Sequence, residues 1–166
     1  GQPSVSASGK QWIWVHAASL GEVGQARAVI SQLIQDHGQN VVVTTMSQSG
    51  ADWVAKEIPA AVHQFMPLDT PRAVAQFLVA WQPIRAVFIE GDLWPRMCRN
   101  LARRGTPAAL LNARASKSRA RFPRSYGYML TPFRLITCQT EAVRAGLMAL
   151  GLPGDRLKCL GDLKAD

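Results

Sequence analysis

Short apolar runs alternate with segments of helical periodicity along almost the whole chain, and this alternation leaves few folds open to it. Runs such as Val41–Thr45 are apolar or β-branched throughout, which is typical of strands buried on both faces of a parallel sheet. The pattern predicts an α/β fold with a doubly wound, mostly parallel sheet of about six or seven strands. The expected strands span residues 12–15, 41–45, 62–66, 86–89, 108–111, 135–138 and 157–160.

Start and stop signals mark several of the helices between these runs. Thr70 followed by Pro71 places a cap directly before a first helical position. Ser49 begins a Ser-x-x-Asp sequence, so we expect Ser49 to cap the helix that follows the second strand. Pro123 interrupts the segment 116–128 and argues against a single straight helix there.

The composition is that of a globular domain. Of 166 residues, 48% are hydrophobic and 18% charged, so we expect residues 1–10 to form a flexible lead-in and residues 11–166 one domain. No apolar run is long enough to span a bilayer, and the lead-in does not resemble a signal peptide. Cys98, Cys138 and Cys159 are widely spaced, so we expect reduced thiols in a cytosolic chain.

The positive charge of the chain is concentrated in one segment. The net charge is +8, and residues 96–134, here called the basic stretch, contain ten Lys or Arg and no Asp or Glu. Such a segment attracts nucleic acid, an anionic membrane surface or a phosphorylated substrate. A solvated helix face explains the charge equally well, so charge alone leaves these possibilities open.

Several enzyme classes lack their motifs here. Gly21 and Gly24 do not form a G-x-G-x-x-G sequence, and no P-loop sequence is present, which argues against dehydrogenases and P-loop enzymes. The histidines lack metal-ligand spacing, and nothing indicates a catalytic triad. His16, at the end of a predicted strand, is interpreted as a packed or hydrogen-bonded core residue.

The turn after the first strand, residues 16–24, combines small residues with one serine and one glutamate. Ligands bind at the carboxyl ends of parallel strands, so this turn is the candidate floor of an active site. Ser19 and Glu22 also have the spacing of a capping box. In that motif Ser19 accepts from the N–H of Glu22, and the Glu22 carboxylate accepts from the N–H of Ser19. From spacing alone, the capping role is favoured.

Three carboxylates, those of Glu22, Glu90 and Asp92, follow predicted parallel strands, and we expect them to converge on one crevice. Transfer of a sugar to a hydroxyl group needs a base that takes the hydroxyl proton. Glu22 is the candidate base, because the helix dipole at a first helical turn favours a carboxylate.

The sequence His16–Glu22, HAASLGE, resembles the signature turn of the bacterial 3-deoxy-D-manno-octulosonic acid (Kdo) transferases. Four further stretches resemble that family in the same order: Val43–Met46 with Ser49-Gly50, Glu90–Pro95, Asn112–Arg114 with Ser116, and Gly161–Lys164. The resemblance implies the amino-terminal, acceptor-binding Rossmann-like domain of a two-domain GT-B glycosyltransferase. That enzyme would transfer Kdo from CMP-Kdo to phosphorylated lipid A precursor in lipopolysaccharide biosynthesis, without a metal or other cofactor.

The resemblance also implies partners and a location. The expected partners are the phosphorylated lipid A precursor, the anionic surface of the bacterial inner membrane at its cytoplasmic face, and a following carboxyl-terminal domain, with no nucleic acid. That domain, which would bind the donor, is absent from this chain, so we expect residues 1–166 alone to be inactive.

A standalone anion- or nucleic-acid-binding α/β module is the alternative. Such a module explains the basic stretch equally well, but it has no use for Glu22. A small-molecule enzyme complete in this domain would need a cofactor motif, and none is found.

Individual residues take roles from the same resemblance. Glu22 would be the general base, while Asp92 and Lys164 would stabilise the transition state. Asp92 is a shorter acid than the family's glutamate at that position, which puts its role in question. The candidate substrate-binding residues are Ser19, Gly21, Arg114, Ser116, Arg119 and Arg121.

Overall fold

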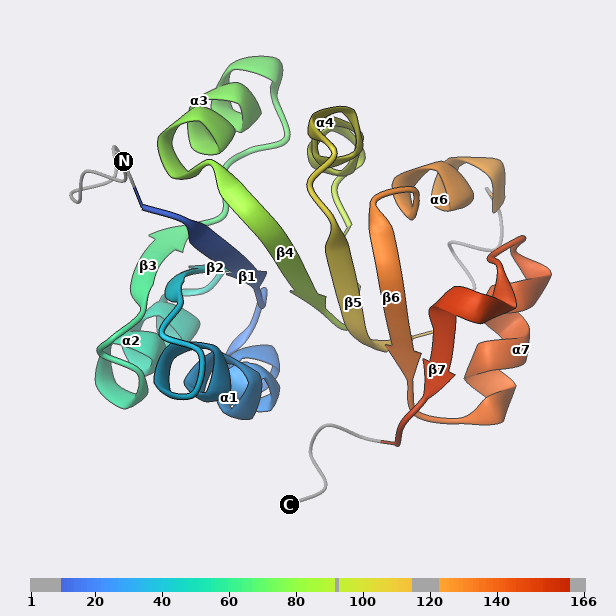
Figure 1. Ribbon diagram of the computed structural model, residues 1–166, viewed down its shortest axis with the longest axis horizontal. Coiled ribbons are helices and arrows are strands. Elements are labelled where there is room, and N and C mark those ends of the chain that lie inside the picture. Colours follow the sequence, from blue (N-terminus) through green and yellow to red (C-terminus); the bar gives the residue numbers. More distant parts are fainter. Residues whose placement is uncertain (1–9, 92, 115–122, 162–166) are drawn as a thin grey trace. The chain divides into compact units, whose positions relative to one another are not determined.

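The computed structural model describes residues 10–91, 93–114 and 123–161, and these residues form a sheet with strand order β3-β2-β1-β4-β5-β6-β7 (Figure 1). The described strands are β1 (Trp12–His16), β2 (Asn40–Thr45), β3 (Val62–Phe65), β4 (Pro83–Ile89), β5 (Ala108–Ala113), β6 (Phe133–Cys138) and β7 (Leu157–Cys159). The pairings of β1 with β2, β2 with β3, β5 with β6 and β6 with β7 are parallel. The predicted α/β fold is therefore confirmed, and each strand overlaps the apolar run that predicted it.

Helices connect successive strands. The described helices are α1 (Leu20–Gln35), α2 (Gln48–Glu57), α3 (Pro71–Trp81), α4 (Pro95–Arg104), α6 (Pro123–Met129) and α7 (Glu141–Ala149), with a 3-10 helix at Gly154–Arg156. Within the described part of the chain, no helix has both the length and the apolarity needed to span a bilayer. The chain divides into two compact units, residues 1–87 and 88–166, and β4 contributes residues to both.

In the first unit, α3 covers one face of the strands and α1 and α2 lie on the other (Figure 1). Successive side chains of a strand point to opposite faces, so Trp12 and Trp14 share a face of β1. The ring centroid of Trp12 lies 4.8 Å from that of Trp81, and the centroid of Trp14 lies 4.9 Å from that of Phe77, both in edge-to-face geometry. These two aromatic contacts anchor α3 above β1.

Two helix caps show where the capping signals were correct and where they were not. Thr70 Oγ1 accepts from the N–H of Ala73 at 3.3 Å, so the predicted cap of α3 is confirmed. The prediction that Ser49 caps α2 is wrong, because the helix begins at Gln48 and Ser47 Oγ accepts from the N–H of Gly50 at 3.2 Å. A Cβ atom on Gly50 would lie 3.0 Å from Ser47 Oγ and 3.2 Å from a methyl carbon of Thr45, so a larger residue here would push these side chains by a few tenths of an ångström.

In the second unit, the pairing of β5 with β6 is irregular near its end. The register shifts between Leu110 and Ala113, where Asn112 adopts a left-handed φ of 56° and donates its N–H to Thr137 Oγ1 at 2.9 Å. Pro123 is the first residue of α6, the position at which a helix tolerates proline.

Cys98, Cys138 and Cys159 are free thiols, and burial raises the pKa of Cys138.

The described part of the basic stretch includes an amphipathic helix, α4. Met97, Cys98 and Leu101 are its buried residues, and its four arginines lie on the exposed side. Those arginines are Arg96, Arg99, Arg103 and Arg104.

Candidate functional site

The turn between β1 and α1 is held to the neighbouring strand by backbone hydrogen bonds. The N–H of Ala17 donates to the carbonyl of Thr44 at 3.0 Å, and the N–H of Met46 donates to the carbonyl of Ala18 at 2.9 Å. Ser19 follows in an extended conformation and is the N-cap of α1. These two hydrogen bonds therefore fix Ala17 and Ala18, the residues between β1 and the cap of α1, to the end of β2.

The Glu22 carboxylate is oriented by two donors from this turn. Its Oε2 atom accepts from the N–H of Ala18 at 2.8 Å, and its Oε1 atom accepts from Ser19 Oγ at 3.1 Å. Ser19 Oγ in turn accepts from the N–H of Glu22 at 3.4 Å, so the serine half of the predicted capping box is confirmed. The other half needs correction, because the backbone donor to the carboxylate is Ala18 and not Ser19. The Glu22 carboxylate thus binds the backbone of Ala18, the residue directly before the N-cap.

The surroundings of Glu22 stabilise its negative charge and also leave the carboxylate near solvent. Glu22 is partly buried, whereas Ser19 and Gly21 are exposed. The positive end of the α1 dipole and the two donors stabilise a carboxylate at this place. A carboxylate held in one orientation beside an exposed turn can accept a proton from a hydroxyl group brought to it.

The first two turns of α1 contain glycines that the described packing does not require. Gly21 and Gly24 are both exposed, and a Cβ atom built on either would meet no heavy atom within 4 Å. Glycine within a helix costs roughly 0.5–1 kcal/mol relative to alanine. A surface without side chains next to Glu22 lets a ligand approach the backbone closely.

His16 precedes this turn and is fully buried at the end of β1. Its Nδ1 atom lies 2.9 Å from Thr44 Oγ1, and burial lowers the pKa of His16 to about 4. The imidazole is therefore neutral near pH 7, and its interpretation as a packed, hydrogen-bonded core residue is confirmed.

In the second unit, Glu90 and Arg114 join the ends of β4 and β5. Arg114 Nη2 lies 2.6 Å from Glu90 Oε1, and the N–H of Glu90 donates to the carbonyl of Leu111 at 2.8 Å. Glu90 has a φ of 59°, a left-handed conformation that costs roughly 1–3 kcal/mol for a residue with a side chain. Arg114, predicted to bind substrate, thus already has an acidic partner, although its side chain stays 57% exposed. Sequence patterns did not reveal this ion pair, since its members are 24 residues apart.

Several predicted site residues lie outside the described residues, namely Asp92, Ser116, Arg119, Arg121 and Lys164. Glu22 belongs to the first unit, and Glu90 belongs to the second. The convergence of these carboxylates on one crevice therefore stays a prediction.

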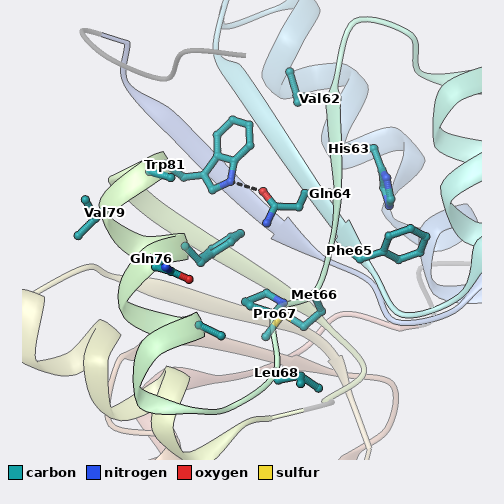
Figure 2. Close-up of a pocket in the computed structure, with 13 residues that line it drawn as sticks. Val62, His63, Gln64, Phe65, Met66, Pro67, Leu68, Gln76, Val79 and Trp81 are labelled. Atoms are coloured by element: carbon teal, nitrogen blue, oxygen red, sulfur yellow. Dashed lines mark hydrogen bonds between the residues drawn. The ribbon is translucent and has the colours of Figure 1, made fainter. Parts of the chain in front are cut away.

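The structure also contains a groove that the sequence patterns did not reveal. It has a volume of about 940 Å³ and lies between β3, the loop after β3, and α3 (Figure 2). Phe65 is 48% exposed, Leu68 is 74% exposed and Val79 is 61% exposed, and all three line the groove. The one signal in the sequence was the mixed polar and apolar character of residues 62–66, unlike the wholly buried runs.

Comparison with known proteins identifies one family for the whole sequence. The family model described as 3-deoxy-D-manno-octulosonic-acid transferase (kdotransferase) matches residues 1–166. The 3-deoxy-D-manno-octulosonic acid transferase of Haemophilus influenzae is 32% identical over 165 residues, which cover 94% of this chain and 38% of that protein. The protein of the same name from Rickettsia prowazekii is 33% identical over 159 residues, covering 92% of this chain and 34% of that protein. The chain thus spans little more than a third of the length of these relatives.

Solved structures share the fold at lower sequence identity. The UDP-GlcNAc 2-epimerase of Methanocaldococcus jannaschii superposes with a TM-score of 0.66 at 11% identity, covering 92% of this chain and 46% of that one. At this identity the likeness shows the fold alone, a Rossmann-like half of a GT-B-type protein.

Proposed function

This chain belongs to the 3-deoxy-D-manno-octulosonic-acid (Kdo) transferase family, as its amino-terminal domain, and we propose that it supplies the acceptor-binding surface and the catalytic base of a Kdo transfer reaction. The donor would be CMP-Kdo and the acceptor a phosphorylated lipid A precursor. The observation that carries the proposal is the Glu22 carboxylate, held by Ala18 and Ser19 at an exposed turn. The family match gives no support to the alternative of a standalone anion-binding module.

In the proposed step, the acceptor hydroxyl oxygen bonds to the anomeric carbon of Kdo while the bond from that carbon to the phosphate oxygen of CMP breaks. Glu22 takes the hydroxyl proton, and CMP leaves with the bonding electron pair. Ser19 Oγ, 3.1 Å from the carboxylate, orients the base through its hydrogen bond. The bare backbone at Gly21 makes room for the acceptor sugar. No metal ion takes part in the proposed step.

The remaining roles belong to the same proposal. Lys164 would offset the negative charge that develops on the leaving phosphate, and Asp92 would support the transition state. Arg114, Ser116, Arg119 and Arg121 would bind the acceptor phosphates. The domain would act at the cytoplasmic face of the bacterial inner membrane, with its basic stretch toward anionic lipids and a carboxyl-terminal donor domain next in the chain.

Replacing Glu22 by glutamine in the full two-domain protein tests the proposal. Glutamine retains an oxygen for the N–H of Ala18 but cannot take a proton, so Kdo transfer should fall roughly 10²- to 10⁴-fold. The free energy of unfolding should change by less than about 1 kcal/mol. Ser19→Ala is the matched control for the cap and should cost about 1 kcal/mol of stability with a smaller loss of rate. Full activity of Glu22→Gln would leave Glu22 with a capping role only.

A further inference from the structure

The groove between β3 and α3 exists because α3 is centred above β1. Its aromatic contacts are with Trp12 and Trp14, and neighbouring strands of a sheet lie about 4.8 Å apart. The helix α3 packs on β1, and β3 is two strands away from β1 in the sheet. The face of β3 is therefore about 10 Å from the strand on which α3 packs. One hydrogen bond, from Trp81 Nε1 to Gln64 Oε1 at 2.6 Å, crosses from the helix to β3, and Figure 2 shows these two side chains facing each other. The groove of about 940 Å³ lies between the same two elements.

The lining of this groove carries no formal charge. None of its thirteen residues is Lys, Arg, Asp or Glu, in a chain with 19 basic and 11 acidic residues. His63 lies 2.9 Å from Thr45 Oγ1, and burial lowers its pKa, so the ring is neutral near pH 7. Burying a charged group in such a groove would be costly, whereas an apolar ligand gains free energy from every exposed side chain that it covers.

Met66 connects the groove to the end of β1, the strand that precedes the Glu22 turn. Met66, which lines the groove, comes directly after β3 and donates its N–H to the carbonyl of Thr45 at 2.9 Å. Its sulfur lies 3.9 Å from Thr44 Oγ1, the same atom that lies 2.9 Å from His16 Nδ1. The side chains of Met66, Thr44 and His16 therefore form a continuous chain of contacts from the groove to the end of β1.

We propose that this groove binds an acyl chain of the acceptor while the acceptor's sugar hydroxyl meets Glu22. The inference rests on the proposed function, because it assumes an acceptor that joins a phosphorylated sugar to acyl chains. An unbranched hydrocarbon suits an uncharged groove of about 940 Å³ whose lining includes a flexible methionine. A peptide strand added to the edge of β3 is the weaker choice, because β3 has only four residues over which to pair with it.

The test compares acylated and fully deacylated acceptor in the two-domain protein, dispersed in detergent. Val79→Glu places a charge in the groove at a side chain that is 61% exposed, so the fold should tolerate it. Ala75→Glu is the matched control, because Ala75 is exposed on the same helix and does not line the groove. Leu68→Ser, in the loop after β3, is a second groove variant outside any helix.

For Val79→Glu we expect the KM for acylated acceptor to rise about tenfold or more, with kcat and the KM for CMP-Kdo unchanged. Transfer to deacylated acceptor should not change, Leu68→Ser should show a smaller shift in the same direction, and Ala75→Glu should match the wild type. An unchanged KM for acylated acceptor, or an equal rise for both acceptors, would overturn the proposal.

Calorimetric titration with acylated acceptor measures binding without turnover and separates the two proposals. If the wild type binds this acceptor and Val79→Glu binds it about tenfold more weakly, the groove is supported even where Kdo transfer fails and the proposed function falls. If both bind equally and only sedimentation with lipid vesicles weakens, the groove contacts the bilayer and the acyl-chain proposal is wrong.

Discussion

Gly21 and Gly24 occupy the same helix one turn apart, and neither is required by the described packing. Alanine at either place should raise the free energy of unfolding by up to about 1 kcal/mol, because it restricts the unfolded chain and favours the helix. The proposed function separates the two residues, since only Gly21 lies between Ser19 and Glu22 in the turn that meets the acceptor. Stability and activity are therefore expected to move in opposite directions at Gly21.

Gly21→Ala should melt at a higher temperature while kcat/KM for the acceptor falls, because its methyl group takes space that the acceptor uses. Gly24→Ala should be stabilised by a similar amount with its activity unchanged. Melting curves and acceptor kinetics of both variants in the two-domain protein provide the measurement. Equal activity in the two variants would remove Gly21 from the substrate-binding residues.

His16 makes the stability of the fold depend on pH. Its pKa is about 4 in the folded state and near 6.5 when unfolded, so the unfolded chain binds more protons between these values. Stability is therefore complete above pH 6.5 and is lost as the pH falls toward 4, by up to about 3 kcal/mol. Burial also lowers the pKa of His63, which adds a loss of the same sign.

Urea unfolding of the wild type and of His16→Gln, at several pH values between 7 and 4, checks this assignment. Glutamine does not titrate, so the variant should lose less stability on acidification, and the remaining slope should include the contribution of His63. Identical slopes for the two proteins would show that His16 is not the group responsible.

At the scale of elements, α4 is an amphipathic helix with one buried apolar side and one exposed basic side. Met97, Cys98 and Leu101 are buried, and the arginines at positions 96, 99, 103 and 104 are exposed. The spacing of three and four residues places most of these arginines along one side of the helix. We therefore expect this exposed side of α4, which is part of the basic stretch, to meet an anionic membrane or a phosphorylated glycolipid.

Vesicles containing anionic lipid should therefore bind the domain with an affinity that falls steeply with salt. Each basic residue near such a surface contributes about 1 kcal/mol, and screening acts within a Debye length. Reversing Arg119 and Arg121 together, or Arg103 on α4, should weaken binding. Lys56→Glu makes the same change of charge as Arg103→Glu at an exposed residue outside the basic stretch, and should have little effect. Co-sedimentation at two salt concentrations is the measurement, and binding insensitive to salt and to Arg103→Glu would contradict the prediction.

At the scale of the molecule, the chain is about as long as one half of its structural relatives and little more than a third of its sequence relatives. Its strands nevertheless form one sheet with a single order, and β4 contributes residues to both compact units. A chain of this length with a buried sheet should fold on its own.

Residues 1–166 alone should give one cooperative thermal transition and no Kdo transfer, because the proposed donor-binding half lies outside this sequence. Calorimetry and a transfer assay on the isolated chain are the measurements, with the two-domain protein as the positive control. Kdo transfer by residues 1–166 alone would contradict the proposed division of the enzyme.

Features that depend on neighbours a few residues away were predictable from the sequence by itself, among them the strand runs, the Thr70 cap and the Ser19 cap. The turn His16–Glu22, together with four further stretches in the same order, also identified the family by resemblance. Features made by contacts between distant residues were decided only by the tertiary structure. Arg114 meets Glu90 across two strands, and the groove lies between β3 and α3, a helix whose aromatic side chains pack on β1. Sequence periodicity says which side of a helix is buried, but the strand on which that side packs depends on how the whole sheet is assembled.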